Sequence, residues 1–318
     1  MITRTNTCRG SRLNVSRSGL GNLMLLATAG AVVGIGTAAL PARASVLFSD
    51  VTLGAAGPTG LNLGIFVTGP TTINASNSGT DFITNMGLAS GSSTNFSGGG
   101  TLTGTLYADP GATIQSNIAS QFNVDGGITT TSLATAVSDV QNAATDAASL
   151  APNQTITGPV GGSPLTINAS GTDTVVNING SISVTNPSNN LTINGTASDY
   201  FIINVSGNIS VTNGAITTTG GIPASHILFN LTGSSSSVSL SNSTSVLTGT
   251  YLAPFSGQKI TISPGTVNGA IIGYQIQTSS GPTINGSPYD AVPEPASLAL
   301  LGFGGLALLA SRRPKTRC

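Results

Sequence analysis

The chain has 318 residues, of which only 6% are charged and 4% aromatic, and its formal net charge is zero. Between Ser45 and Val292 the only basic residue is Lys259, set against nine Asp, so this body has a formal charge of −8. Binding to a phosphate backbone requires clustered Lys and Arg, which excludes nucleic acid as a partner of the body. With 39% apolar residues and a mean hydropathy of +0.26, the composition predicts a packed structure rather than disorder.

Residues 1–44 have the features of a secretory signal peptide. Four Arg precede an apolar run at 23–40, and the segment ends in Ala42 and Ala44, which form an A-x-A cleavage site before Ser45. We therefore expect signal peptidase to cut after Ala44. The alternative is an N-terminal membrane anchor, for which the apolar run is barely long enough.

Residues 46–125 are rich in Gly, Ser and Thr with short apolar segments, which we interpret as irregular early coils of a β structure. The pattern changes over 132–150, where Thr130 or Thr131 is the expected N-cap and Pro152 the stop. The apolar residues there recur at the spacing of one helix face: Leu133, Ala136, Val137, Val140, Ala143, Ala144 and Ala147. Because this face is mostly Ala, we expect the helix to pack closely along a sheet.

Residues 165–213 contain one pattern twice, first as LTINASGTDTVVNINGSISVTN and then as LTINGTASDYFIINVSGNISVTN. Leu165 corresponds to Leu191 at a spacing of 26, and Ile182 corresponds to Ile209 at a spacing of 27. In each copy apolar residues alternate with Thr, Ser and Asn, which is the period of a strand, and Asn-Gly pairs supply turns. One such coil cannot bury its own inward face, so successive coils must stack.

The repeat predicts a mostly β fold. We expect a right-handed β-solenoid over 45–290 with the 132–150 helix on its flank, and hydrophobic targeting helices at both chain ends. Strand-like segments continue from 156 to 284. Eight residues of the repeat should point inward in stacked rows: Leu165, Ile167, Leu191, Ile193, Ile182, Val184, Ile209 and Val211.

The last segment, 291–318, has three parts in order. Val292, Pro293, Glu294 and Pro295 come first, an apolar run fills 296–310, and the basic residues Arg312 and Arg313 follow. This arrangement resembles the PEP-CTERM sorting tail of exopolysaccharide-producing bacteria. A plain C-terminal anchor is the alternative.

The PEP-CTERM resemblance implies a processing enzyme and an export route. A membrane exosortase would recognise the tail and cleave it, after the protein has halted in the inner membrane with its basic residues inside. The body would then reach the cell surface or the extracellular matrix, where exopolysaccharide is a candidate partner. Cys8 and Cys318 both lie in segments expected to be removed, so the mature protein would have no disulfide.

The region 151–290 resembles the choice-of-anchor A domain, a secreted body that is paired with interchangeable sorting tails. The matching segments, in order, are 202–207, 226–230, 249–254, 267–272 and 284–289. That family supplies no catalytic residues to transfer. The strand–helix–strand layout is also similar to bacterial ice-binding adhesins, whose β-solenoid has a helix alongside it.

No catalytic, metal or cofactor site is predicted. His226 is the only histidine, and a lone His without an orienting partner and a nucleophile is interpreted as structural. Asp173 and Asp199 lie 26 residues apart and could stack as the carboxylate pair of a glycosidase, but we favour a repeated turn position for both. Calcium loops, thiolate–histidine sets and phosphate-binding loops have no counterpart in the sequence.

The predicted function is that of a non-enzymatic, exported surface or matrix protein. An ice- or carbohydrate-binding solenoid is the first alternative, because Thr166 and Thr192, and likewise Thr185 and Thr212, recur over two coils. A regular Thr ladder on a flat face would favour the ice binder. A polysaccharide-active β-helix enzyme is the second alternative, and a cleft with paired carboxylates would favour it.

Overall fold

The computed structural model describes four stretches of the chain, residues 46–76, 79–116, 118–286 and 288–291. The predicted signal peptide and the tail from Val292 onward lie outside these stretches. The cleavage residues Ala42, Ala44 and Ser45 therefore remain predictions. Within the described stretches, no helix has the length and apolar character needed to cross a membrane.

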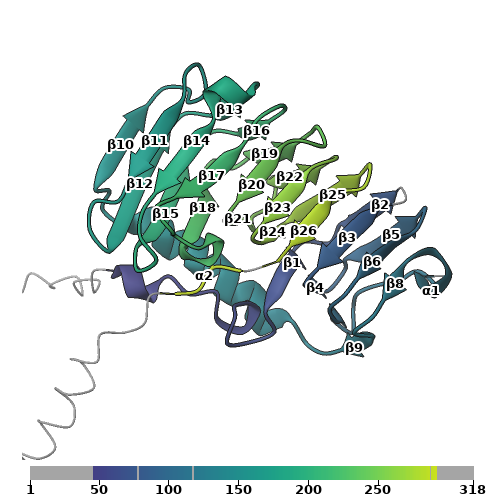
Figure 1. Cartoon of the computed structure of the whole chain (residues 1–318). Coiled ribbons are helices and arrows are strands. Elements are labelled where there is room, and N and C mark those ends of the chain that lie inside the picture. The colour runs from purple at the N-terminus through teal and green to yellow at the C-terminus, as the bar shows by residue number, and fades with distance from the viewer. Residues whose placement is uncertain (1–45, 77–78, 117, 287, 292–318) are drawn as a thin grey trace, which may run out of the picture. The chain divides into compact units, whose positions relative to one another are not determined.

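The described chain is a stack of parallel strands in four sheets, shown in Figure 1. Sheet A has the order β10 (Gln154–Thr157), β12 (Asp173–Asn179), β15 (Tyr200–Val205), β18 (Ile227–Leu231), β21 (Thr250–Ala253), β24 (Ile271–Gly273), β1 (Leu63–Val67), β4 (Asn85–Leu88), β7 (Leu106–Ala108) and β9 (Ile128–Thr130). Sheet B has the order β13 (Ile182–Val184), β16 (Ile209–Val211), β19 (Ser237–Leu240), β22 (Lys259–Ile262), β25 (Gln275–Ser279), β2 (Thr72–Ser76) and β5 (Ser93–Ser97).

The third side of the stack is made of two sheets. Sheet C has the order β20 (Val246–Thr248), β23 (Thr266–Asn268), β26 (Thr283–Asn285), β3 (Thr80–Ile83), β6 (Gly100–Leu102) and β8 (Asn123–Val124). Sheet D has the order β11 (Leu165–Asn168), β14 (Leu191–Asn194) and β17 (Ile216–Thr219). An isolated bridge between Ala215 and Val246 joins sheet D to sheet C. Each full coil thus contributes one strand to sheet A, one to sheet B and one to the third side.

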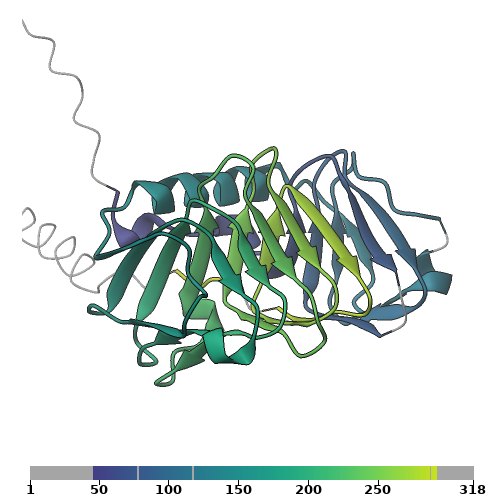
Figure 2. The same ribbon diagram turned by 90° about the horizontal axis from the view of Figure 1, so that it is seen from above.

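Two α-helices and four 3-10 turns complete the described elements. They are α1 (Ile118–Gln121), α2 (Ala134–Ser149), η1 (Phe48–Asp50), η2 (Gly54–Ala56), η3 (Pro187–Asn189) and η4 (Ala224–His226). The long helix α2 lies along the stack, as Figures 1 and 2 both show. This confirms the predicted flanking helix, which begins two residues later and ends one residue earlier than 132–150.

The coils are not stacked in chain order. The chain enters at β1, in the middle of sheet A, and builds outward through β4 and β7 to β9 at one end. Helix α2 then runs back to β10 at the other end, and the later coils return toward the middle of the stack (Figure 2). There β24 pairs with β1, and Ile65 lies opposite Ile271. The first and last coils therefore meet in the middle, an arrangement that the sequence analysis does not predict.

The 26/27-residue repeat forms stacked coils, as predicted. Leu165 pairs with Leu191 and Ile167 with Ile193 in sheet D, and the sheet B pairs are Ile182 with Ile209 and Val184 with Val211. Seven of these eight side chains are fully or almost fully buried. Leu165 is only half-buried because it belongs to the first coil of the series, which has no neighbour on one side. The right-handed sense of the solenoid stays a prediction from the handedness of parallel crossovers.

The central strands of sheet A are buried on both faces, whereas the end strands β9 and β10 are exposed or half-buried. In β15 the side chains of Phe201, Ile203 and Val205 enter the interior of the solenoid, whereas Tyr200 and Ile202 join a second apolar cluster on the outer face. Helix α2 supplies its predicted apolar face to that second cluster. Val51, Leu53, Ala56 and Tyr289 pack in the same cluster. Two-sided burial explains why the central strands of sheet A are nearly continuous apolar runs.

Two expectations for the first half of the chain are wrong. The part of 46–125 from Leu63 onward forms regular coils, not irregular ones, with parallel pairs such as Met86 opposite Leu106, while the part before it contains only the turns η1 and η2. The helix N-cap is Leu133, whose backbone N–H donates to the Asp109 carboxylate at 3.0 Å, while Thr130 belongs to β9. The carboxylate that stabilises the helix start therefore comes from a neighbouring coil.

Glycine shapes the corner between sheets C and A. Gly249 and Gly269 both have positive φ, at 114° and 143°, and they lie on successive coils. A Cβ at Gly269 would lie 2.0 Å from the Gly249 carbonyl oxygen, so no other residue fits without moving backbone.

Candidate functional site

The outer face of sheet B carries a row of uncharged polar side chains. Each belongs to the middle of its strand and lies opposite the next: Ser183, Ser210, Ser239, Thr261 and Gln277. The row changes from short hydroxyls to an amide as it crosses the sheet. Lys259, at the start of β22, adds one cation beside Thr261 on the same face. This face can offer many hydrogen bonds, but its side chains differ in length.

The outer face of sheet D carries the regular Thr positions. Thr166 lies opposite Thr192, as predicted, and Thr192 lies opposite Thr217, so this row spans three coils rather than two. Beside it, the Asn194 side-chain amide donates to Asn168 Oδ1 at 2.9 Å, and Thr219 Oγ1 donates to Asn194 Oδ1 at 3.0 Å. Sheet D is therefore a short polar face with a Thr row and a hydrogen-bonded amide row.

The row that begins with Thr185 and Thr212 does not continue with a threonine in the next coil. Both residues are exposed just beyond β13 and β16. The next coil places Ser241 there, because its N–H donates to the Val211 carbonyl just as the N–H of Thr212 donates to the Val184 carbonyl. The predicted two-coil repeat is thus correct in position, and serine continues it.

Asp173 and Asp199 do not form a stacked carboxylate pair. Asp173 lies opposite Tyr200, because one extra residue in the second copy shifts the spacing from 26 to 27 before this strand begins. The Asp199 carboxylate instead accepts from the Thr196 N–H at 2.6 Å and from Thr196 Oγ1 at 3.0 Å. The turn interpretation is confirmed for Asp199, whereas Asp173 is the exposed first residue of β12.

The single histidine belongs to a cluster that the sequence analysis does not identify. The ring of His226 stacks on Tyr200, with centroids 3.8 Å apart and planes 16° apart, and His226 Nδ1 lies 3.1 Å from the Asp199 carbonyl oxygen. Asp173 is the neighbour of Tyr200 across the strand pair. The Asp290 N–H donates to the Ser225 carbonyl at 2.8 Å, which brings the end of the body to the same place.

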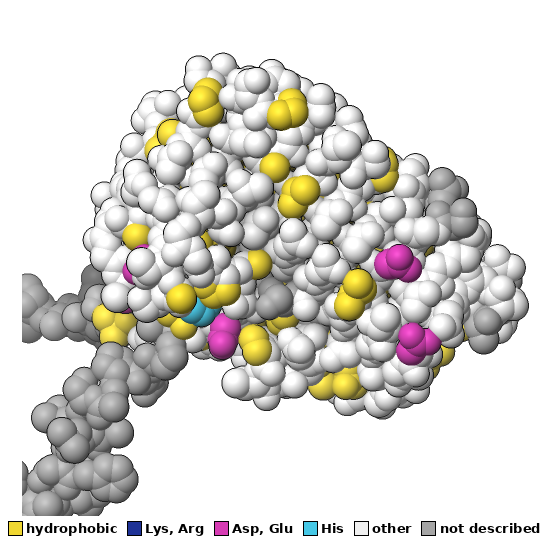
Figure 3. Space-filling model, viewed as in Figure 1, with side chains coloured by type: hydrophobic (Ala, Val, Ile, Leu, Met, Phe, Trp, Pro, Cys, Tyr) yellow, Lys and Arg dark blue, Asp and Glu magenta, His cyan; other side chains and the backbone are white. Residues whose placement is uncertain are grey.

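We call Asp173, Tyr200, His226 and Asp290 the exit corner. Burial and the nearby carboxylates of Asp290 and Asp173 raise the pKa of the Tyr200 phenol, and partial burial raises the pKa of Asp173. Figure 3 shows the histidine at the surface beside an acidic side chain and apolar side chains. The sequence holds no motif for this corner, because its members come from three coils and from the end of the body.

Tyr289 fixes the end of the body. Its side chain is fully buried in the cluster that includes α2, and its hydroxyl has no hydrogen-bond partner among the described residues. Burial raises the pKa of this phenol far above its ordinary value, and the Asp173 carboxylate contributes in the same direction. The body thus ends in a packed segment only two residues before position 291.

A row of asparagines connects sheet A to helix α2. The Asn230 side-chain amide donates to Asn204 Oδ1 at 2.9 Å, and that of Asn204 donates to Asn177 Oδ1 at 3.2 Å. The same two amide groups donate to the carbonyls of Ala144 and Ala147 in α2. A polar cavity of about 160 Å³ lies at the Asn177 end of this row. These contacts fix the helix on the sheet, so we assign the row a structural role.

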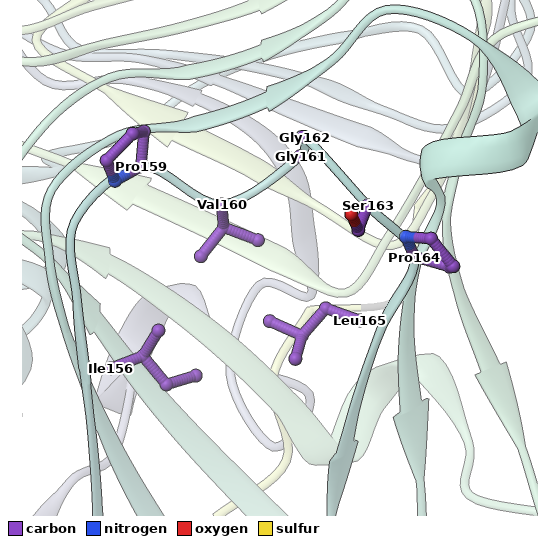
Figure 4. A pocket seen from close by; sticks show the side chains of 8 residues that line it. All are labelled: Ile156, Pro159, Val160, Gly161, Gly162, Ser163, Pro164 and Leu165. Carbon is purple, nitrogen blue, oxygen red and sulfur yellow. The ribbon is translucent and has the colours of Figure 1, made fainter.

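A wider cavity, of about 420 Å³, lies at the end of the stack formed by β10 and β11. Figure 4 shows its lining, in which Ile156, Val160 and Leu165 point toward one another beneath the loop that carries Pro159 and Pro164. The lining has no charged side chain and only one side-chain hydroxyl, that of Ser163. It is the apolar interior of a terminal coil, and it lacks the groups that chemistry on a substrate requires.

The described residues contain no group of three or more His, Cys, Asp or Glu side chains that could hold a metal ion. The exit corner has a histidine and carboxylates, but among the described residues the partners of the histidine ring are the Asp199 carbonyl oxygen and the Tyr200 ring, neither of which is a nucleophile. The geometry is that of a parallel solenoid in which the outer faces of sheets B and D carry hydroxyl and amide side chains.

Two known family models match the chain. Residues 26–285, more than half of the chain, match the putative ice-binding-like adhesive domain, so the chain belongs to this family. Residues 291–313 match the PEP-CTERM protein-sorting motif. The sorting motif confirms the predicted tail and implies processing by an exosortase and sorting toward the cell surface. The body is thus an ice-binding-like adhesive domain, and membership of the choice-of-anchor A family is not shown.

Solved structures share the fold. An ice-binding protein from the Antarctic ascomycete Antarctomyces psychrotrophicus is 19% identical, with a TM-score of 0.51, over 73% of this chain and 96% of that one. An ice-binding protein from an Arctic yeast is 17% identical, with a TM-score of 0.50, over 78% of this chain and 99% of that one. At these identities the likeness concerns the fold alone. No curated protein matches the chain.

Proposed function

We propose that this chain is an exported, non-enzymatic adhesive protein whose solenoid body is released to the cell surface or extracellular matrix when its tail is processed. The observation that carries the proposal is the combination, in one chain, of an ice-binding-like adhesive domain that matches to residue 285 with a sorting motif that begins at residue 291. The binding surfaces would be the outer faces of sheets B and D, which are polar and almost uncharged.

The chemistry of these faces favours a neutral, hydroxylated ligand. Ser, Thr, Asn and Gln side chains donate and accept hydrogen bonds without requiring a counter-charge. The strand spacing of about 4.8 Å repeats each group along the sheet. A polysaccharide is a repeating, hydroxyl-rich polymer that can make many weak contacts with such a face, so exopolysaccharide is the proposed partner.

The sorting part of the proposal is tested by replacing Pro293, Glu294 and Pro295 with alanine in the full chain. We expect the wild-type body to leave the membrane fraction and the variant to remain there. Mass spectrometry of the mature protein should give a product that begins near Ser45 and ends near the motif. A mature product that still carries Cys318 would show that the tail is only an anchor.

Ice binding is the second candidate, and the three-coil row of Thr166, Thr192 and Thr217 favours it. A row of identical hydroxyl and methyl groups at strand spacing is a regular surface of the kind that an ordered lattice can match. The measurement is inhibition of ice recrystallisation by the purified mature body. Activity that is lost in Thr192→Lys, but kept in Ser210→Lys on sheet B, would assign ice binding to sheet D.

The enzyme alternative has lost its candidate pair, because Asp173 and Asp199 do not occupy equivalent positions. We expect no release of sugars when the mature body is incubated with acidic and neutral polysaccharides. Release of sugars that disappears in Asp173→Asn would instead restore the enzyme hypothesis.

A further inference from the structure

We propose that the exit corner is a docking surface for the membrane enzyme that processes the tail, so that the enzyme contacts the folded body as well as the motif. The inference rests on the proposed sorting of this chain. It concerns Asp173, Tyr200, His226 and Asp290, which the sorting motif itself does not include.

The first step is where the body ends. The buried side chain of Tyr289 and the hydrogen bond from the Asp290 N–H to the Ser225 carbonyl hold the last residues against the solenoid. The motif match begins at residue 291. The packed body is therefore followed at once by the sorting motif, and the tail must leave the molecule at the exit corner.

The second step is the length of the tether. An extended chain spans at most about 3.6 Å per residue, so the segment from 291 to 295 reaches about 18 Å. An enzyme that holds Pro293, Glu294 and Pro295 must then come within that distance of Asp290. Because a protein domain is larger than this reach, part of the enzyme surface has to face the exit corner.

The third step is the chemistry of the surface. Asp173 and Asp290 are exposed and acidic, and the stacked rings of Tyr200 and His226 lie beside them. Exposed carboxylates suit Lys or Arg side chains, which pair with their charge. An anionic lipid surface would repel a body of charge −8, which favours a protein with basic side chains as the occupant.

The test compares processing of the full chain in its own cells with that of Asp173→Lys. This residue is exposed and far from the motif in sequence, so the change leaves the motif intact. Asp81→Lys, at an exposed position on sheet C, is the matched control for the change in charge. Pulse-chase immunoblotting should show processing of Asp173→Lys slowed by about three- to tenfold, with Asp81→Lys close to wild type. Equal rates for all three chains would overturn the proposal.

A spacer sharpens the result. Inserting about twelve Gly and Ser residues between Ala291 and Val292 gives a flexible tether that no longer forces the enzyme against the exit corner. The difference in processing rate between the wild-type and Asp173→Lys bodies should then shrink, because the effective concentration of the corner at the enzyme falls. If Asp173→Lys is slowed as much as it is without the spacer, the charge acts elsewhere and docking is wrong. Absence of any cleavage in the unaltered wild type would refute the proposed sorting instead, so the two failures are distinguishable.

The occupant is identified by a photo-crosslinking amino acid placed at position 173 of the full chain. An adduct with the enzyme whose deletion abolishes tail cleavage supports docking, whereas adducts with lipid alone would assign the corner to the membrane surface and overturn the proposal. Thermal unfolding of the secreted Asp173→Lys body, compared with that of wild type, checks that the fold is unchanged.

Discussion

The central strands of sheet A have both faces buried, whereas sheet B buries one face and exposes the other. Strand β15 of sheet A is buried at every position, while β16 of the same coil alternates, with Ser210 between buried Ile209 and Val211. The difference arises because α2, residues 46–56 and the end of the body cover sheet A. The outer face of sheet A therefore contributes to the stability of the fold, whereas the outer faces of sheets B and D remain accessible to solvent.

The largest expected effect is a difference in stability between substitutions at two matched outer-face positions of one coil. Ile202→Ala removes a fully buried side chain from the outer face of sheet A and should lower the free energy of unfolding by about 2–5 kcal/mol. Ser210→Ala on sheet B should change it by less than about 0.5 kcal/mol. Urea unfolding of the mature body measures both. Equal losses would mean that the outer face of sheet A is not a second core.

Two asparagine rows provide the next comparison. Asn204→Ala removes buried hydrogen bonds to Ala147, Asn177 and Asn230, and it should cost about 2–3 kcal/mol because polar partners are left unsatisfied beneath α2. Asn194→Ala breaks the exposed row of sheet D, where water replaces the lost partner, and should cost less than about 1 kcal/mol. Urea unfolding again supplies the values. A larger loss for Asn194→Ala would contradict the structural role of the buried row.

Much of this two-sided architecture is predictable from sequence. The alternation in 182–184 and 209–211 predicts a half-exposed sheet, and the Ala-rich face of 132–150 predicts a helix against a sheet. The interleaved coil order is not predictable in this way, because the pairing of Ile65 with Ile271 joins residues that no local pattern relates. The coils there repeat at 20 to 22 residues, as from Met86 to Leu106, and do not match the 26/27 spacing of the later repeat.

The candidate sites also divide into residues that the sequence predicts and residues that it does not. Thr166 and Thr192 are visible as a repeat, and the register of strands places them in one row. The Asp173–Asp199 pairing fails by a single residue, which in a strand reverses the face on which a side chain lies. The exit corner has no sequence signal because Asp290 reaches Tyr200 and His226 only through the path of the folded chain.

A substitution that changes the packing beneath α2 should have a smaller effect on the free energy of unfolding. Ala143 is buried against sheet A, so Ala143→Leu should lower the free energy of unfolding by about 1–3 kcal/mol through overpacking. Ala134→Leu, at an exposed position of the same helix, is the control and should change stability little, since Leu and Ala have similar helix propensities. Thermal unfolding of both variants tests whether α2 lies as close to the sheet as the Ala face requires.

The smallest expected effect is the pH dependence contributed by the buried phenols. Burial raises the pKa of Tyr251 and of Tyr289 above the ordinary value of about 10. A raised folded-state pKa means that the stabilisation is fully present below about pH 10 and is lost as the pH rises further, because only the unfolded chain releases the proton. Each phenol should then cost about 1.4 kcal/mol per pH unit above pH 10. Urea unfolding at pH 8 and pH 11 should show a smaller drop for Tyr289→Phe than for wild type. An identical drop in the two proteins would mean that Tyr289 is exposed to solvent, and the end of the body would then not be packed against sheet A.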